Sequence, residues 1–381
     1  MKTVLFVQLS SGMGGAATSL LTLAKGVRKL GYRPMIAGQQ DREGLWEAAE
    51  KEEIDYYPLY ITSWTRKHAS VSDIFYLPNR LNTIRRLVGI CKRESVDLIH
   101  TNQIQTLDGA IAARILGIPH VFHARDMFTD PSIATWWGGP KTTIRIVDRF
   151  SDQIIAISKA VAELLDTVDK DKIHVVYNAV EIPVLEVDKR TEARRRFDIP
   201  VDAEVAVIVG QVIDRKGHDD FVIALKKLYK RGKPVYGLVA GNGETDYINH
   251  LKSEAGDVYR KGYLRFTGHL SPVWPAYMAS DIVVCPSWTE GFGRVVVEGM
   301  LAGKPVVATS VGGIVEIIEH RANGLLVPPA SPHDLADAID ELLTNRDLAQ
   351  RLAAKGRSDA EITYSPDSHA RNILSVYREL I

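Results

Sequence analysis

Short apolar runs alternate with helix-like segments along almost the whole chain, and this alternation constrains the fold more than any other feature. In the first half, the runs predicted as buried strands are Val4–Leu9, Arg33–Ala37, Asp97–His100, Ile118–His123 and Gln153–Ile157. The segments predicted as helices between them are Ala17–Leu30, Leu81–Arg93, Leu107–Leu116 and Lys159–Asp166. Repeated strand–helix units predict an α/β fold, with a parallel sheet covered by helices on both faces.

The same alternation starts again in the second half. The predicted strands there are Val205–Val209, Tyr236–Ala240, Leu264–Phe266, Ile282–Cys285, Pro305–Thr309 and Gly324–Val327. Between the two series the pattern loosens into proline and mixed charge, IPVLEVDK, at residues 182–189. Because 381 residues suffice for two domains, we predict one domain over residues 1–183 and a second over 184–360.

Composition argues against several other classes of protein. Lys plus Arg and Asp plus Glu number 47 each, so the net charge gives no support for nucleic-acid binding. Cys91 and Cys285 are too few and too far apart for a disulfide framework or a zinc cluster, and we expect two core residues in a reducing compartment. The first apolar run is too short for a signal peptide, and no run is long enough to span a bilayer. These features predict a cytoplasmic protein.

A glycine-rich turn, SSGMGGAATS, follows the first predicted strand and leads into a predicted helix. Glycines allow close backbone approach, and the free N–H groups of a helix N-terminus attract phosphate or carboxylate. Gly12, Gly14 and Ala17 match a G-x-G-x-x-A dinucleotide fingerprint, but AGQQ stands where that fingerprint needs an acidic residue. We therefore predict an anion or sugar contact here, with nicotinamide binding and a purely structural turn as alternatives.

The corresponding turn of the second half is GQVIDRKGHDDF, which carries Arg215 and Lys216 just before a predicted helix. Two cations beside a helix N-terminus suit a diphosphate. A solvated pair in a connecting loop is the alternative.

The most informative stretch is DIVVCPSWTEGFGRVVVEGMLAGKPVVATSVGG. A predicted strand ends at Cys285, and a loop with Glu290 and the triplet Gly-Phe-Gly precedes an apolar helix. Glu298 interrupts that helix, where an unpaired carboxylate would be costly, so we expect it to have a partner such as a pair of hydroxyl groups. The alternatives are a structural salt bridge for Glu298 and a solvated loop carboxylate for Glu290.

These residues resemble a known family. The segment EGFGRVVVE, at 290–298, is similar to the E-x(7)-E motif of retaining family 4 glycosyltransferases of the GT-B fold. The segments DRKG, GNGE, GMLAGKPVVAT, VGG, NGLLVPP and TYSPDSHARNILSVYRELI also resemble that family, and the similarity is loosest between about residues 40 and 95. The resemblance implies two facing Rossmann-like domains with parallel sheets and an interdomain cleft. It also implies that residues 361–381 cross back onto the first, acceptor-side domain.

The resemblance assigns the C-terminal domain to the donor. Glu290 would contact the sugar near the reacting centre, as a catalytic residue. Gly291 and the amides of Phe292 and Gly293 would hold the sugar and its phosphate, and Glu298 would bind the ribose diol.

The same resemblance assigns the diphosphate to Lys216, with Arg215 nearby. Many relatives carry Gly-Arg at the start of this loop, whereas this chain has Gln211 after the glycine. Arg215 or Arg294 would then have to supply the missing cation.

Further roles implied by the resemblance lie at the nucleotide base and in the first domain. The backbone of His269 and Leu270 would contact the base. Gly14 and Gly15 would approach the diphosphate, and His123 would lie beside the transferred sugar as a second catalytic residue. No cofactor is implied. The single D-x-D, Asp169-Lys170-Asp171, lies away from the donor motif and is expected to form a turn, so no metal site is predicted.

Basic residues gather in one predicted helix of the first domain: Arg80, Arg85, Arg86, Lys92 and Arg93. Helical spacing predicts that Leu81, Ile84, Leu87, Val88 and Cys91 face a core. Trp136 and Trp137 lie near Lys141 in a separate loop. Basic and aromatic side chains together suit an anionic lipid surface or a lipid-linked acceptor, at the inner face of the membrane. A solvated basic face and a packed tryptophan pair are the alternative.

The resemblance thus implies a retaining, metal-independent hexosyltransferase with a nucleotide-sugar donor and a glycan or lipid-linked acceptor, in polysaccharide or cell-envelope glycan synthesis. UDP-glucose is the first candidate donor and GDP-mannose the second. The alternatives are a nucleotide-sugar epimerase of similar fold, a dinucleotide oxidoreductase, and a nucleotide-sugar-binding protein that has lost catalysis.

Transfer should not depend on a divalent cation, because a lysine and a helix N-terminus are predicted to take the metal's place at the diphosphate. We expect the rate to survive exhaustive chelation. Complete loss of transfer, restored by magnesium or manganese, would contradict this mechanism.

Overall fold

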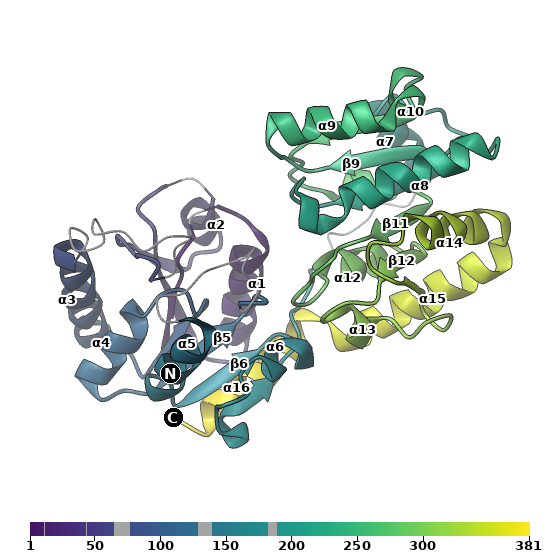
Figure 1. Cartoon of the computed structure of the whole chain (residues 1–381). Helices are drawn as coiled ribbons and strands as arrows, with labels where there is room; N and C mark the ends of the chain where they lie inside the picture. Colours follow the sequence, from purple (N-terminus) through teal and green to yellow (C-terminus); the bar gives the residue numbers. More distant parts are fainter. Residues whose placement is uncertain (11, 43, 65–76, 129–138, 182–188) are drawn as a thin grey trace. The chain divides into compact units, whose positions relative to one another are not determined.

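A computed structural model describes the chain except residues 11, 43, 65–76, 129–138 and 182–188 (Figure 1). The chain divides into two compact units. Unit 1 comprises Met1–Glu181 and Tyr364–Ile381, and unit 2 comprises Ile182–Thr363. Each unit contains one parallel sheet, which confirms the predicted α/β class. The predicted boundary after residue 183 falls in 182–188, outside the described residues.

Unit 1 is built on a seven-stranded sheet of order β3-β2-β1-β4-β5-β6-β7. Its strands are β1 (Thr3–Val7), β2 (Arg33–Gly38), β3 (Asp55–Pro58), β4 (Leu98–Thr101), β5 (His120–Ala124), β6 (Gln153–Ala156) and β7 (Ile173–Val175). Its helices are α1 (Gly15–Lys29), α2 (Leu45–Lys51), α3 (Leu77–Arg93), α4 (Asp108–Leu116), α5 (Gly139–Arg149), α6 (Lys159–Glu163) and the C-terminal α16 (Pro366–Arg378).

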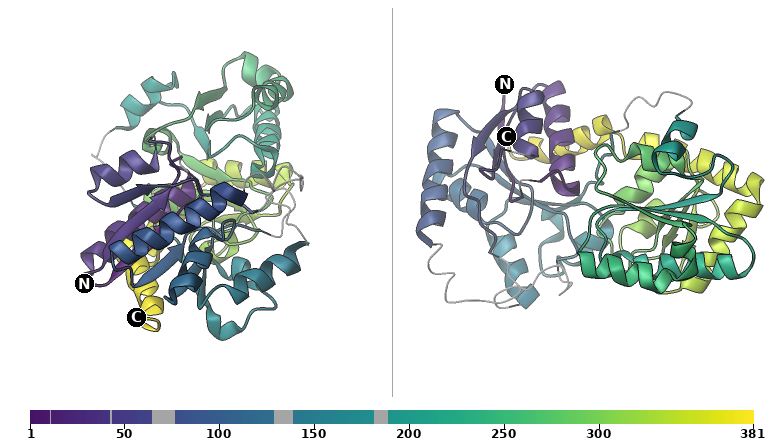
Figure 2. Two further views of the ribbon diagram at one scale, coloured as in Figure 1. Left: turned by 90° about the vertical axis from the view of Figure 1, so that its left-hand side faces the viewer. Right: turned by 90° about the horizontal axis from the view of Figure 1, so that it is seen from above.

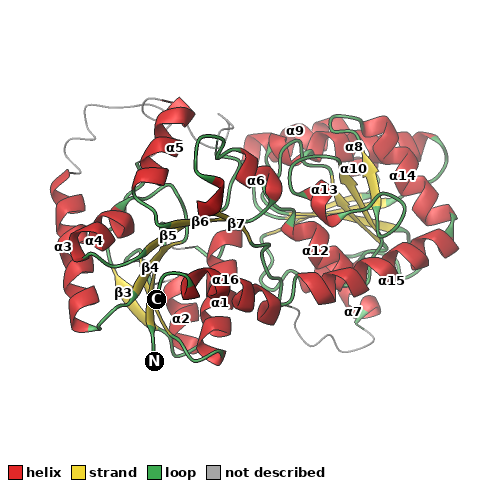
Figure 3. Ribbon diagram, turned by 90° about the horizontal axis from the view of Figure 1, so that it is seen from below, coloured by secondary structure: helices red, strands yellow, loops and turns green. Residues whose placement is uncertain are grey.

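Both faces of this sheet are buried, which explains why the central strand β1 is apolar without interruption from Val4 to Val7. Val4 and Phe6 of β1 pack in one core with residues of α1, α2 and α16. Leu5 and Val7 point to the other face and pack with residues of α3 and α4. Figure 3 shows these two helical layers on either side of the strands.

The last helix belongs to unit 1 although it follows unit 2 in the sequence. It packs along α1, as the yellow and purple helices of Figure 2 show. The contact is close at Gly26, where an added Cβ would lie 2.6 Å from the Cβ of Ala370. A side chain at residue 26 would therefore push α16 away from the core.

Unit 2 is built on a six-stranded sheet of order β10-β9-β8-β11-β12-β13. Its strands are β8 (Val205–Val209), β9 (Tyr236–Ala240), β10 (Leu264–Gly268), β11 (Ile282–Cys285), β12 (Val306–Thr309) and β13 (Leu325–Val327). Its helices are α7 (Arg190–Arg196), α8 (His218–Lys230), α9 (Thr245–Ala255), α10 (Asp257–Arg260), α11 (Trp274–Ala279), α12 (Arg294–Leu301), α13 (Ile314–Ile317), α14 (Pro332–Thr344) and α15 (Arg346–Thr363). Residues of α8, α9 and α14 share a core with one face of the sheet.

Several elements of both units were not predicted from the sequence. In unit 1 these are strand β3 and the helices α2 and α5, and in unit 2 the helices α7, α9, α10, α11 and α15. Leu81 is 48% exposed rather than buried. Arg80 turns inward, because its Nε donates to the fully buried Asp108 at 2.9 Å. Trp136 and Trp137 lie outside the described residues. None of the helices in the described ranges is both long and apolar enough to cross a membrane.

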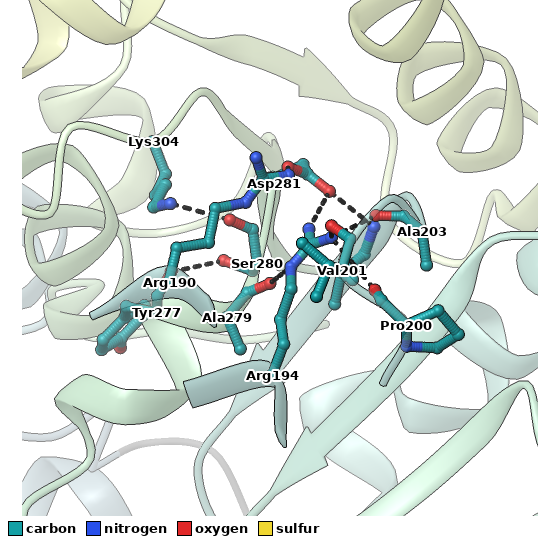
Figure 4. A network of polar contacts seen from close by, with 11 residues as sticks. Arg190, Arg194, Pro200, Val201, Ala203, Tyr277, Ala279, Ser280, Asp281 and Lys304 are labelled. Carbon is teal, nitrogen blue, oxygen red and sulfur yellow. Dashed lines mark hydrogen bonds and ion pairs between the residues drawn. The ribbon is translucent and has the colours of Figure 1, made fainter. Parts of the chain in front are cut away.

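A fully buried guanidinium ties α7 to the sheet of unit 2 (Figure 4). Arg194 Nε donates to the carbonyl of Ala279 at 3.0 Å, and one Nη donates to Asp281 at 2.8 Å. The other Nη donates to the carbonyls of Pro200, Val201 and Ala203. Asp281 also accepts from the amide of Val205 at 2.8 Å, so one ion pair joins α7, β8 and the turn before β11.

Arg194→Met should destabilise unit 2 by about 3–5 kcal/mol, because it leaves a carboxylate and several carbonyls without their donor. Arg190→Met is the matched control. Arg190 donates to the same Asp281 but is 51% exposed, and an exposed pair contributes below about 1 kcal/mol. Denaturant unfolding of both variants measures the difference, and equal effects would contradict the assigned role of Arg194.

Candidate functional site

The predicted donor residues of unit 2 meet where the strand order of its sheet reverses. Strands β8 and β11 are neighbours, but β9 follows on one side of the pair and β12 on the other. The loops that leave β8 and β11 therefore diverge, and ligands of open α/β sheets bind in the crevice that this creates at the carboxyl ends of the strands. Lys216 lies in the first loop, within the 3₁₀ turn Asp214–Lys216, and Glu290 lies in the second.

The two loops are joined by a direct ion pair. Lys216 Nζ lies 2.5 Å from Glu290 Oε2, and Ser287 Oγ lies 3.4 Å from the same oxygen. The side chains of Lys216 and Glu290 are 21% and 18% exposed, so the pair is partly open to a ligand. The amide of Trp288 donates to the carbonyl of Arg215 at 2.8 Å, which fixes the two loops at a second point.

Glycines without room for a side chain hold the Glu290 loop in place. A Cβ on Gly312, whose φ is 47°, would lie 1.9 Å from the carbonyl oxygen of Glu290. The amide of Gly313 donates to that same carbonyl at 3.1 Å. A Cβ on Gly217, whose φ is 72°, would lie 1.9 Å from the carbonyl oxygen of Pro286. These contacts fix the backbone of the loop that carries Glu290 against its neighbours.

Gly293 supplies the turn from the loop into α12. Its φ of 104° lies in the left-handed region, which favours glycine. Helix α12 has no side-chain N-cap and no acidic residue in its first turn, so no carboxylate opposes an anion there. Phe292 is 3% exposed and anchors the loop in the core. Gly291 lies between this anchor and Glu290.

Glu298 lies on α12 and is 7% exposed. Arg294 Nε donates to one carboxylate oxygen at 2.7 Å, and the hydroxyl of Tyr277 donates to the other at 2.6 Å. The salt bridge weighed as an alternative in the sequence analysis is therefore present. Each carboxylate oxygen has a second lone pair, so the ion pair does not prevent Glu298 from accepting hydrogen bonds from a ligand. Sequence reasoning missed Tyr277, which lies on the preceding helix without a motif.

Many relatives have an arginine at the position of Gln211, and Arg215 and Arg294 are the two candidates to supply that cation here. The two arginines differ in their ion pairs. Arg294 forms an ion pair with Glu298. Arg215 makes no ion pair with the part of the chain that the structure describes. Gln211 is exposed.

His269 and Leu270 follow β10, at the same edge of the sheet as the other donor residues. The amide of His269 donates to Asn242 Oδ1 at 2.7 Å. Asn242 lies in the GNGE segment, where Gly241 has no room for a side chain because its Cβ would meet the carbonyl oxygen of Gly210 at 1.7 Å. The three loops after β8, β9 and β10 are thus packed on one another.

In unit 1, Gly14 and Gly15 stand at the N-terminus of α1. Neither needs to be glycine for reasons of its own fold: Gly14 has a φ of −72°, and an added Cβ on either residue would meet nothing within 4 Å. Helix α1 has no side-chain cap and no acidic residue in its first turn. The space above these glycines is therefore open to a ligand.

His123 is fully buried at the end of β5. Its Nδ1 lies 3.1 Å from Nε2 of His100 and 3.1 Å from an Nη of Arg125. Burial, together with the Arg125 charge, holds the pKa of His123 well below its usual range, so the ring is neutral at pH 7. Among the described residues, its Nε2 has no hydrogen-bond partner. Arg125 also donates to Asn102 and Asn178, and neither it nor these two was predicted from the sequence.

The D-x-D forms the predicted turn. Asp169 Oδ1 accepts from the amide of Asp171 at 3.1 Å and caps the 3₁₀ turn Lys170–Lys172. Among the described residues, no group of three or more His, Cys, Asp or Glu side chains is placed to hold a metal ion.

Two family matches cover most of the chain. Residues 13–182 match glycosyltransferase family 4, and residues 189–359 match the glycosyl transferases of group 1. An uncharacterised glycosyltransferase of Methanocaldococcus jannaschii is 30% identical over 302 residues, which are 76% of this chain and 78% of that protein. The chain belongs to the family 4 glycosyltransferases. A D-inositol 3-phosphate glycosyltransferase of Nocardioides sp. is also similar to this family 4 member, with 28% identity over 74% of this chain and 67% of that protein.

Solved structures confirm the GT-B fold of this glycosyltransferase. HepE of Anabaena, in complex with UDP and glucose, superposes with a TM-score of 0.85 at 23% identity, over the whole of both chains. Sucrose-phosphate synthase of Thermosynechococcus elongatus gives a TM-score of 0.77 at 19% identity, over 100% of this chain and 99% of the other.

Proposed function

We propose that this glycosyltransferase moves a hexose from a nucleotide sugar to a glycan or lipid-linked acceptor with retention of the anomeric configuration. UDP-glucose is the first candidate donor and GDP-mannose the second. The observation that carries the proposal is the Lys216–Glu290 ion pair at the switch point of the unit 2 sheet. A cation and a carboxylate side by side suit the two halves of a sugar diphosphate: Lys216 the phosphates, Glu290 the sugar hydroxyls.

The chemistry follows from the charge that develops when the sugar leaves. The departing nucleoside diphosphate gains negative charge, and fixed positive charge nearby stabilises it without reorganisation. Lys216 and the N-terminus of α12 supply that charge in unit 2, and Arg215 adds a cation without an ion-pair partner among the described side chains. In unit 1, the N-terminus of α1, at Gly14 and Gly15, offers a second set of backbone N–H donors for an anion.

The relatives support the donor class. HepE has been solved with UDP and glucose and with UDP-glucose. Other relatives are named for transfer to D-inositol 3-phosphate. The first experiment therefore combines UDP-, GDP- and ADP-sugars with glycan, lipid-linked and inositol phosphate acceptors, and measures released nucleotide and product linkage. Interconversion of the nucleotide sugar without transfer would favour an epimerase, and binding without turnover would favour a silent binding protein.

Contact with an anionic membrane surface is a lesser part of the proposal. Helix α3 presents less positive charge than its sequence suggests, because Arg80 forms an ion pair with Asp108 and Arg93 forms one with Glu94. Arg85 and Lys92 are exposed on α3 and remain candidates for the headgroups of anionic lipids.

Glu298→Gln should weaken UDP binding by about 10- to 100-fold, the worth of one charge-assisted hydrogen bond of roughly 1.5–3 kcal/mol to the ribose. Calorimetry with UDP measures it. Tyr277→Phe is the control, because it removes the hydroxyl bonded to Glu298 without changing the carboxylate charge. Equal UDP affinity in Glu298→Gln and wild type would remove the ribose assignment.

Glu290→Ala should lower the transfer rate by about 10²–10³-fold, as expected for the loss of one positioned transition-state contact. The loop is held by its backbone, through the carbonyl of Glu290 and the amide of Gly313, so the fold should survive truncation. UDP should bind at least as tightly, because Lys216 loses a competing carboxylate. Melting temperature, UDP affinity and transfer rate are compared. A rate near wild type, or a parallel loss of all three, would contradict the assignment.

A further inference from the structure

Trp288 lies in the loop after β11, just before Glu290, and the donor contacts described above give its side chain no role. The side chain is 42% exposed, so burial accounts for only part of its position. Its indole Nε1–H donates to Asp220 Oδ2 at 2.7 Å. Asp220 belongs to the first turn of α8 and is 7% exposed. A hydrogen bond to a nearly buried carboxylate fixes the orientation of the indole ring.

The backbone of Trp288 bonds to the loop after β8 as well. Its amide donates to the carbonyl of Arg215 at 2.8 Å. Arg215 directly precedes Lys216, and Asp220 follows Lys216 in the first turn of α8. The two hydrogen bonds of Trp288 therefore hold the chain on both sides of Lys216 against the loop that carries Glu290.

The Lys216–Glu290 ion pair joins the same two loops, but through groups that a donor would engage. Both side chains are partly exposed. On the proposed function, the diphosphate binds Lys216 and the sugar binds Glu290, so this link between the loops is lost in the donor complex. The bonds of Trp288 use an indole N–H, a backbone amide and the carboxylate of Asp220, which the proposed donor contacts leave untouched. These bonds can therefore persist when the ion pair is broken.

A purely structural explanation of the Trp288–Asp220 bond is that it only satisfies a nearly buried carboxylate. The N-terminal end of α8 also stabilises a carboxylate at this position, because the helix dipole is positive there. On that explanation, loss of the indole N–H would change the stability of unit 2 but would not depend on Glu290. A role in transfer would depend on Glu290.

We propose that Trp288 is a positioning residue for transfer, which keeps Lys216 and Glu290 at their working separation after the donor has broken the ion pair between them. Trp288 acts through these two residues rather than by contact with the donor. The proposal rests on the proposed function for its role in transfer, whereas the link from Trp288 to Asp220 is a property of the free protein.

¹⁵N NMR of the full chain tests that link without any substrate. The indole signal of Trp288 is assigned by its loss in Trp288→Phe. Asp220→Ala and Asp220→Asn remove the same charge, but only asparagine keeps a side-chain oxygen that accepts from the indole. We expect the indole proton to exchange with solvent about 10-fold faster or more in Asp220→Ala, and to stay protected in Asp220→Asn. Equal exchange in Asp220→Ala and wild type would overturn the proposal, whatever the enzyme transfers.

Trp288→Phe gives the kinetic readout, because it keeps an aromatic ring and removes the indole N–H. We expect kcat to fall roughly 5- to 50-fold while KM for the donor changes by less than about 3-fold, as for a defect felt in the transition state. Trp46→Phe is the matched control. It also removes an indole N–H bonded to a carboxylate, that of Glu50 at 2.8 Å, but in unit 1, and should leave kcat as it is. Equal kcat in Trp288→Phe and wild type would overturn the proposal.

The two Asp220 variants test whether the indole bond carries the kinetic effect. Asp220→Ala should lower kcat by about as much as Trp288→Phe, and Asp220→Asn should keep most of the wild-type rate. An equal loss in both Asp220 variants would assign the effect to the charge at the N-terminus of α8 and would overturn the proposal.

A double-mutant cycle separates positioning from a structural role. If Trp288 acts through Glu290, then Trp288→Phe should lower the residual rate of Glu290→Ala by less than about 2-fold, because coupled residues are not additive. The same fall in both backgrounds would show an effect independent of Glu290 and would overturn the proposal. Absence of transfer from every nucleotide sugar would instead contradict the proposed function, while the link would still be judged by NMR of the free protein.

Discussion

Burial of both faces of each parallel sheet limits where this protein can carry polar chemistry. Helices cover the two faces of the unit 1 sheet, and the central strand β1 between them is apolar from Val4 to Val7. A polar group in the middle of such a sheet would lose its hydration without gaining a partner. In each unit, the candidate site residues therefore lie at the edge of the sheet where the strands end and the loops begin.

Charges at the unit 2 edge are arranged in pairs. Lys216 pairs with Glu290, and Arg294 pairs with Glu298, so neither carboxylate is left uncompensated in a partly buried site. On the proposed function, the arriving diphosphate competes with Glu290 for Lys216, which frees the carboxylate for the sugar. The Arg294–Glu298 pair is more buried and also accepts from Tyr277, so it stays in place and presents its remaining lone pairs. On the proposed function, Lys216 and Glu290 thus exchange partners when the donor binds, whereas the Arg294–Glu298 ion pair is kept.

In unit 1, the equivalent edge depends on neutral groups. Burial holds the pKa values of His100 and His123 well below their usual range, and Arg125 adds to that effect. A neutral imidazole has one donor and one acceptor, so its behaviour depends on which nitrogen carries the proton. In this protein, the hydrogen-bond partners of each ring determine which nitrogen carries the proton. One of these partners is Tyr377, which comes from α16 near the end of the chain. The close contact between Gly26 and Ala370 holds that helix against α1, and Tyr377 of the same helix lies within hydrogen-bond distance of His100.

The sequence by itself determined the two α/β series, because short apolar runs that alternate with helix-like segments are typical of the buried strands of a parallel sheet. The resemblance assigned Lys216 and Glu290 to two parts of one donor, the diphosphate and the sugar, and the structure joins the two side chains in an ion pair. The sequence could not determine β3, α2 and α5, whose sequences are short or polar and depend on packing against neighbours. Tyr277 on Glu298, Arg80 on Asp108 and the Tyr377–His100–His123 chain were decided only by tertiary structure. These contacts join residues 21 to 277 positions apart, and no local spacing rule connects positions that distant.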